Sequence, residues 1–112
     1  VVQDITVGDG AEATGTRTLV VHYTLWFYDP AGTDNKGTLI QRSRDFGNPF
    51  SFRMGTNAVI PGFEQGVTGM RVNGVRRVII PPSLAYGTTG NGQGIPGNAW
   101  LVFELELLAA VD

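Results

Sequence analysis

The side chains that could do chemistry in this chain are mostly aromatic, and groups suited to covalent or metal chemistry are scarce. The 112 residues contain one histidine, His22, and no cysteine. A nucleophilic triad and a transition-metal site therefore lack their usual groups, and we expect no metal ligands. His22 lies between Val21 and Tyr23 in a β-branched and aromatic run, which favours a structural or solvent-edge histidine.

A glycine-rich segment, residues 87–98, invites comparison with a phosphate-binding loop. It holds five glycines and one proline, but it opens no predicted helix and contains no lysine. Phosphate binding is therefore not indicated. A loop this long and glycine-rich inside a compact domain is usually functional or disordered. Because it directly follows Tyr86, we favour a functional loop.

What remains is a set of aromatic side chains that could line an apolar cleft. They are spread along the chain: Tyr23, Phe50, Phe63, Tyr86 and Phe103. The same five could instead simply form the core. That alternative is weaker for the two tyrosines, because a buried phenol needs a hydrogen-bond partner and a pure core would prefer phenylalanine. The pattern alone leaves the cleft and the core about equally supported.

The elements that must position these side chains are predicted by hydrophobic periodicity. Alternation with period two predicts strands over four ranges: 18–27, 49–54, 74–80 and 100–108. Such strands form a largely antiparallel sheet with one covered face, and Tyr23, Phe50 and Phe103 fall on that face. Pro81 and Pro82 close the third strand, because proline cannot donate to a sheet ladder. Residues 29–36 are predicted to be a turn-rich loop.

One short helix, from Pro61 to about Gly69, is predicted to cover that face. Pro61 suits the first helical position. Phe63, Val67 and Met70 recur at i, i+4 and i+7, which indicates an apolar stripe of helical period. Three glycines each weaken the helix by about 1 kcal/mol relative to alanine, so packing must hold it. The predicted fold class is α+β, an antiparallel half-barrel wrapped around one helix.

Composition limits the remaining possibilities. The length predicts a single domain over residues 1–112. The net charge of −2, with both signs scattered, argues against nucleic acid or a membrane surface as partner. We interpret the basic clusters Arg42–Arg44 and Arg76–Arg77 as solvated surface, and Glu104 and Glu106 as solubilising groups. The chain does not begin with methionine, which suggests a processed start, and the compartment stays open.

Four separated motifs, residues 20–24, 59–66, 78–87 and 101–108, closely resemble the FKBP-type peptidyl-prolyl isomerases. The resemblance implies a sheet wrapped around a short helix, with a shallow pocket for a proline ring between them. Matched motif by motif, it implies these site residues: Tyr23, Ile40, Gln41, Phe50, Val59, Ile60, Phe63, Tyr86, Ile95 and Phe103. Phe63 stands where the family usually has a tryptophan. Ile60 would donate its backbone N–H to a ligand carbonyl, and Tyr86 its hydroxyl to another.

The implied activity is rotation of Xaa-Pro bonds without cofactor or covalent chemistry. The implied partners are proline-containing peptides, unfolded proteins and macrolide ligands, bound by a monomer. Two alternatives stay open from the residues: a non-catalytic module that recognises proline-containing segments or a partner protein, and a purely structural domain whose own side chains fill the pocket.

The chain departs from the family pattern at one wall of the implied pocket. Ile40 and Gln41 stand where the family usually has phenylalanine and aspartate, and Phe46 stands at the position of the arginine that pairs with that aspartate. Losing both charges together is energetically coherent, because a lone buried charge is costly. We therefore expect a neutral wall, weakened macrolide binding and retained fold. Gly97 also replaces the second proline of a usual Pro-Pro pair.

Overall fold

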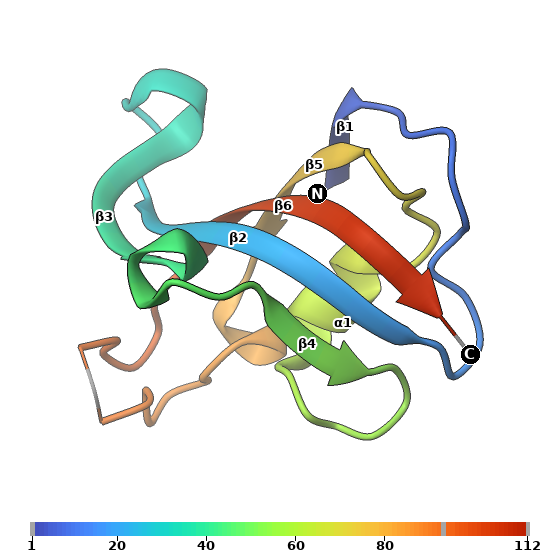
Figure 1. Cartoon of the computed structure of the whole chain (residues 1–112). Coiled ribbons are helices and arrows are strands. Elements are labelled where there is room, and N and C mark those ends of the chain that lie inside the picture. The colour runs from blue at the N-terminus through green and yellow to red at the C-terminus, as the bar shows by residue number, and fades with distance from the viewer. Residues whose placement is uncertain (1, 93, 112) are drawn as a thin grey trace.

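An open antiparallel sheet curves around one helix in the computed structural model, which describes residues 2–92 and 94–111 (Figure 1). The described residues form six strands: β1 (Val2–Thr6), β2 (Thr18–Tyr28), β3 (Lys36–Arg42), β4 (Phe50–Arg53), β5 (Val75–Ile80) and β6 (Leu101–Val111). The strand order is β1-β5-β6-β2-β3. β4 pairs with the first part of β2, on the same edge that β3 pairs with farther along the strand. The predicted α+β half-barrel is confirmed. Residue 93, within the predicted glycine-rich loop, lies outside the described part.

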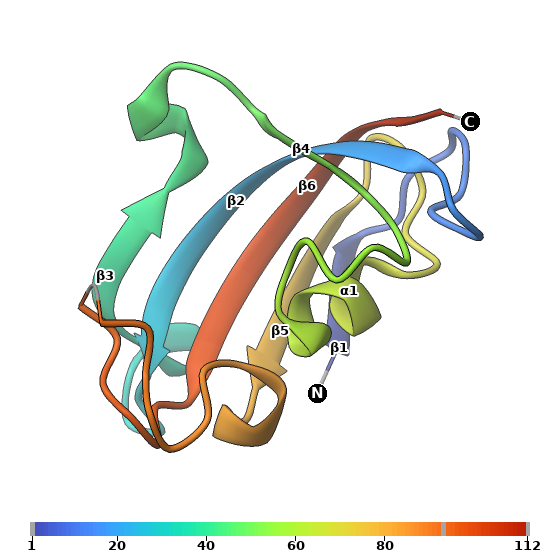
Figure 2. The ribbon, with the colours of Figure 1, turned by 90° about the horizontal axis from the view of Figure 1, so that it is seen from below.

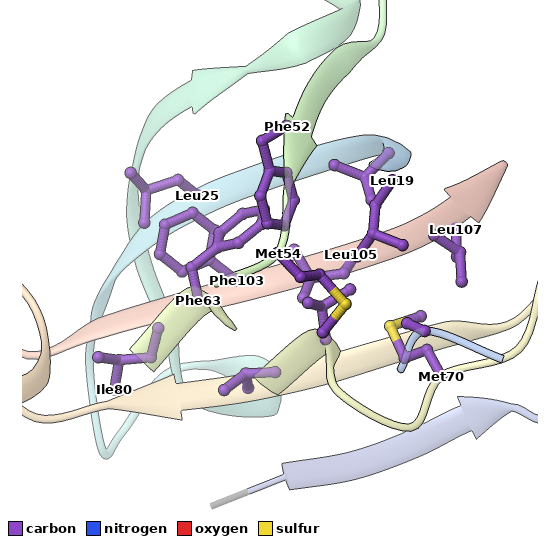
Figure 3. Close-up of a cluster of buried hydrophobic side chains, with 14 of the residues drawn as sticks. Leu19, Leu25, Phe52, Met54, Phe63, Met70, Ile80, Phe103, Leu105 and Leu107 are labelled. Carbon is purple, nitrogen blue, oxygen red and sulfur yellow. The ribbon is translucent and has the colours of Figure 1, made fainter. Parts of the chain in front are cut away.

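The two longest strands, β2 and β6, form the centre of the sheet. They pair from Thr18↔Val111 to Phe27↔Leu101, with one register shift after Val20. Their alternate side chains, among them Leu19 and Leu105, are buried, as the period-two pattern predicts. β6 runs three residues beyond the predicted strand. Figure 3 shows how these side chains meet Phe52, Phe63 and Phe103 in one core.

Helix α1 (Pro61–Val67) lies on one face of the sheet beside β5 (Figure 2). Pro61 occupies its first turn, and Phe63, Val67 and Met70 are buried, as predicted. The glycines explain the close approach of helix and strand. A Cβ built on Gly62 would lie 2.4 Å from Cγ2 of Ile80, and one on Gly66 would lie 2.7 Å from Cγ2 of Val78.

This packing reverses the effect expected of a glycine-to-alanine change in a helix. Gly66→Ala gains helix propensity, but its methyl group collides with a β-branched side chain that has few rotamers. We expect a loss of at least about 1 kcal/mol in the free energy of unfolding, measured by urea denaturation. Gln65→Ala, on the exposed face of α1, is the control and should change stability by less than about 0.5 kcal/mol. A stabilised Gly66→Ala variant would contradict the close contact with β5.

Two strands have no counterpart in the sequence prediction. β1 pairs with β5, and every residue of it is exposed. β3 begins at Lys36, directly after a 3-10 helix, Thr33–Asn35, inside the range predicted as loop. Neither β1 nor β3 contributes a continuous buried face, so their sequences lack the alternation that reveals a strand.

The basic pair at 76–77 corrects the prediction of a solvated surface. The side chains of Arg76 and Arg77 are only 13% and 14% exposed. Arg76 donates to the carboxylate of Asp4 and to the carbonyls of Gly66 and Thr68, which fastens the end of α1 to the sheet.

Arg77 belongs to an ion-pair network on the sheet. It contacts Glu104 at 3.0 Å and Asp34 at 3.3 Å, and Lys36 reaches the same Glu104 carboxylate at 2.7 Å. Glu104 is therefore a paired group and not merely a solubilising one, and Glu106 likewise pairs with Arg44 at 2.6 Å.

The cluster at 42–44 is solvent-exposed at its two arginines, as predicted. No helix among the described residues has the length and apolar character needed to cross a membrane.

Candidate functional site

A cavity of about 420 Å³ opens between α1 and the neighbouring strands. Strands β2, β3, β4 and β6, the segment 57–60 before α1, α1 itself and the turn after β5 all contribute to its walls. The residues that line it are Tyr23, Leu25, Gln41, Phe50, Asn57, Ala58, Val59, Ile60, Phe63, Tyr86 and Phe103. None of these side chains carries a formal charge at pH 7, so the wall that the described residues form is neutral. The side chains of the described residues leave this space open.

Phe63 forms the aromatic centre of the site and is only 4% exposed. Its ring meets those of Tyr23, Phe50 and Phe103 edge to face, at centroid distances of 6.1, 6.2 and 5.2 Å. Figure 3 shows Phe63 projecting from the helix toward Phe103 on β6. Edge-to-face pairs at these distances are favourable and geometrically specific, so the rings hold one another in place.

Tyr23 carries a polar group into this aromatic wall. Its hydroxyl donates a hydrogen bond of 2.7 Å to Oε1 of Gln41 on β3. The phenol therefore has the partner that a tyrosine in an apolar wall requires, and Gln41 supplies it without a charge. Burial raises the pKa of the Tyr23 hydroxyl above its usual value, and the nearby Tyr86 raises that pKa further.

This raised pKa predicts how stability changes in alkaline solution. The folded state holds the Tyr23 proton more tightly than the unfolded state, whose phenol has a pKa of about 10. The raised pKa of Tyr23 therefore contributes its full share to the free energy of unfolding below about pH 10, and this share is lost as the pH rises above that value. We expect urea unfolding above pH 10 to show a smaller decline in stability for Tyr23→Phe than for the unmodified protein. Equal declines in the two proteins would contradict a raised pKa of Tyr23 in the folded state.

Tyr86 and Ile60 place hydrogen-bond donors at the cavity. Tyr86 follows the 3-10 helix Pro82–Leu84, where the N–H of Gly87 donates to the carbonyl of Pro82 at 2.8 Å and closes the turn. Ile60 precedes the first residue of α1, and its carbonyl accepts from the N–H of Phe63. Within the described part of the chain, neither the Tyr86 hydroxyl nor the Ile60 N–H has an internal partner. Both can therefore bind an acceptor on a ligand.

The structure brings eight of the ten predicted site residues together around this cavity. The two exceptions are Ile40 and Ile95. Ile40 is half-buried against the core, and Ile95 is buried within the core cluster, so neither lines the cavity. Ile95 is held there by its N–H, which donates to Oδ1 of Asn91. The functional roles of all ten residues remain predictions.

Three lining residues were not predicted: Leu25, Asn57 and Ala58. Leu25 shares the buried face of β2 with Tyr23, so its alternation gave a usable signal. Asn57 and Ala58 belong to an irregular turn, and Asn57 has a left-handed backbone with φ of 58°. Asparagine tolerates that conformation better than most residues, but tolerance alone does not indicate a cavity.

Comparison with known proteins shows the family to which this chain belongs. Residues 10–108 match the family model described as FKBP-type peptidyl-prolyl cis-trans isomerase. The chain belongs to this family. FKBP relatives match it over different shares of their own length. FK506-binding protein 2 of Dictyostelium discoideum is 47% identical over 90 residues, which are 80% of this chain and 62% of that protein. The FK506-binding protein of Neisseria meningitidis serogroup B is 36% identical over 112 residues, 100% of this chain and 96% of that protein.

Solved FKBP structures have the same fold. The crystal structure of FkpA from Escherichia coli superposes with a TM-score of 0.82 and 35% identity, covering 98% of this chain and 47% of that one. The crystal structure of AtFKBP13 gives a TM-score of 0.83 and 31% identity, covering 98% of this chain and 91% of that one. The resemblance inferred from the four motifs is therefore confirmed at the level of family and fold.

Proposed function

We propose that this chain is a peptidyl-prolyl cis-trans isomerase that accelerates rotation about Xaa-Pro bonds in peptides and unfolded proteins. The observation that carries the proposal is the neutral aromatic cavity whose wall holds two donors, the Tyr86 hydroxyl and the Ile60 N–H, that have no partner among the described residues. Family membership supports the same activity. No cofactor is needed, because no bond is made or broken.

The physical basis is preferential binding of the twisted amide. Rotation about a peptide bond crosses a barrier of about 18–20 kcal/mol because amide resonance is lost. The twisted state is less dipolar than the planar amide, so its transfer from water into an apolar cavity costs less free energy. The rings of Tyr23, Phe63 and Phe103 offer such surroundings, and the proposed site therefore stabilises the transition state more than the ground state.

The proposed hydrogen bonds hold the substrate in that geometry. The N–H of Ile60 and the hydroxyl of Tyr86 would each donate to a substrate carbonyl beside the proline. These bonds also position the rotating bond over the aromatic rings, which lowers the entropy cost of reaching the twisted state.

The direct test is the rate of cis–trans isomerisation of a short Xaa-Pro peptide with and without micromolar protein. We expect relaxation much faster than the uncatalysed process, which takes tens to hundreds of seconds at 25 °C. A heat-unfolded sample is the control. An unaccelerated rate with folded protein would reject the enzyme and favour a binding module with the same cavity.

Tyr86→Phe tests the proposed donor. Removing one oxygen should leave the fold intact and weaken binding of a proline-containing ligand by about 0.5–1.5 kcal/mol, the net value of a neutral hydrogen bond. Isothermal titration calorimetry measures the difference. Tyr28→Phe, which removes a hydroxyl outside the cavity lining, is the matched control. Unchanged affinity in Tyr86→Phe would show that its hydroxyl does not reach the ligand.

The proposed ligands include macrolides, bound weakly. Relatives carry the name FK506-binding protein, and the cavity of this chain supports a related ligand site. Its wall offers the amide of Gln41, so a ligand would lack a charge-assisted hydrogen bond there. We further propose that residues 1–112 act as one domain and as a monomer; the core cluster that the described residues form from Ala13 to Ala110 supports the single domain.

A further inference from the structure

Strand β2 has a gap along the edge that faces β3 and β4. β3 pairs with it from Tyr28 back to Thr24, and β4 pairs with it from Thr18 to Val21. His22 and Tyr23 lie between the stretches of β2 that pair with β3 and with β4. Opposite them, the segment that joins β3 to β4 leaves the sheet as the 3-10 helix Ser43–Phe46. Backbone groups of a strand interior require partners, so something else must replace the missing strand.

The side chain of Ser43 occupies this gap. It is only 2% exposed and is the buried polar residue of the described part of the chain. The N–H of Tyr23 donates to Oγ of Ser43 at 2.9 Å, and the Ser43 hydroxyl lies 3.3 Å from the carbonyl oxygen of Tyr23. The same Oγ lies 2.8 Å from Nδ1 of His22. The Ser43 oxygen thus provides the acceptor that a neighbouring strand would offer to the Tyr23 N–H, and its single proton is shared between the Tyr23 carbonyl and Nδ1 of His22 according to the imidazole tautomer.

Ser43 also connects the two partners of the hydrogen bond in the cavity wall. Tyr23, whose backbone it binds, is the donor, and Gln41, two residues before Ser43 in the chain, is the acceptor. A shift of the 3-10 helix relative to β2 would therefore change the distance between phenol and amide. It would also disturb the edge-to-face contact between the rings of Tyr23 and Phe63.

We propose that Ser43 is a positioning residue for the cavity. Its hydroxyl fixes the backbone of Tyr23 against β3, which holds the phenol ring in the aromatic wall and within reach of Gln41. Ser43 itself does not line the cavity. The kinetic part of this inference rests on the proposed isomerase function, whereas the structural part does not.

Residue-resolved amide hydrogen exchange tests the structural part without any activity. In Ser43→Ala, the amide of Tyr23 loses its acceptor, and we expect its exchange to accelerate at least about tenfold relative to that of Leu25 on the same strand. Ser51→Ala, the same change at an exposed site on β4, should leave this ratio unchanged. An equal acceleration of all β2 amides would indicate general destabilisation and overturn the proposal, as would an unchanged Tyr23 amide.

Steady-state kinetics test the functional part. A displaced catalytic wall reduces rates by up to about 100-fold, and we expect kcat/KM of Ser43→Ala to fall roughly tenfold while Ser51→Ala retains full activity. Ser43→Thr keeps the hydroxyl and should recover most of the loss. If the additional methyl group of Ser43→Thr prevents folding, the ratio of Tyr23 to Leu25 amide exchange in Ser43→Ala still tests the proposal. Unchanged kcat/KM in a variant that has lost the Tyr23 protection would refute the positioning role. An inactive unmodified protein would reject the proposed function and leave the exchange result standing.

Discussion

Replacing Phe63 by alanine is expected to lower the free energy of unfolding by about 3–5 kcal/mol and to abolish isomerase activity. Phe63 is almost fully buried and packs against four aromatic rings, those of Tyr23, Phe50, Phe52 and Phe103. Its loss removes the apolar area of one ring and leaves a void that the sheet cannot fill, because helix α1 is held close to β5. The same void opens the apolar cavity to water, which removes the proposed desolvation.

Urea denaturation and the peptide isomerisation assay measure the two effects. The matched control is Phe46→Ala, the same substitution at a phenylalanine that is 64% exposed. That variant should stay within about 0.5 kcal/mol of the unmodified protein. Activity of Phe63→Ala must be measured at a temperature where circular dichroism still shows the folded state. A folded and fully active Phe63→Ala variant would contradict the role of this ring in the site.

The sequence predicts the part of the fold that touches the core. The ranges 18–27, 49–54, 74–80 and 100–108 match β2, β4, β5 and β6 within a few residues, because each strand has one buried face. Helix α1 has the same basis in its stripe of Phe63, Val67 and Met70. The local sequence identifies the glycines of α1 only as weak helix formers, because the close approach of β5 is a tertiary contact that no local pattern contains.

Elements without a buried face escape this reasoning. β1 is exposed along its length, and β3 is predominantly polar, so both depend on pairing with strands that are distant in sequence. The same holds for Arg76 and Arg77, which resemble surface charges until Asp4 and Glu104 are brought beside them. Ser43 is the extreme case, because a serine between two arginines gives no sign of burial.

The residues of the candidate site likewise differ in how far the sequence predicts them, according to whether they lie on a strand with a buried face or in a turn. Tyr23, Phe50 and Phe103 lie on strand faces that alternation assigns correctly, so their convergence follows from the sheet. Tyr86 and Ile60 are positioned by turns, and only the family resemblance indicated them. Ile95 lies in the core cluster and does not line the cavity, and the composition of the long glycine-rich loop gave no indication that one of its residues is anchored there.

Gln41 is the position at which this chain should differ most from its relatives in ligand affinity. Its amide accepts the Tyr23 hydroxyl at 2.7 Å, in a cavity whose described lining carries no charge. A carboxylate there would accept a charge-assisted hydrogen bond, worth about 1.5–3 kcal/mol. We expect the unmodified protein to bind a macrolide such as FK506 weakly and still to isomerise prolyl bonds, because isomerisation depends chiefly on desolvation and positioning.

Restoring the charges should recover macrolide affinity in two steps. Gln41→Asp alone should recover only part, because residue 41 is exposed in the free protein and a bound macrolide would desolvate a carboxylate that has no cationic partner. Phe46→Arg alone should change little, since residue 46 is largely exposed. The double variant should tighten binding by up to about 3 kcal/mol, or roughly 150-fold, and by more than the sum of the single changes. Titration calorimetry of the four proteins gives this coupling directly, with kcat/KM expected to vary far less than affinity. An additive double variant would mean that side chains at 41 and 46 do not meet, and that the neutral wall is set by Gln41 alone.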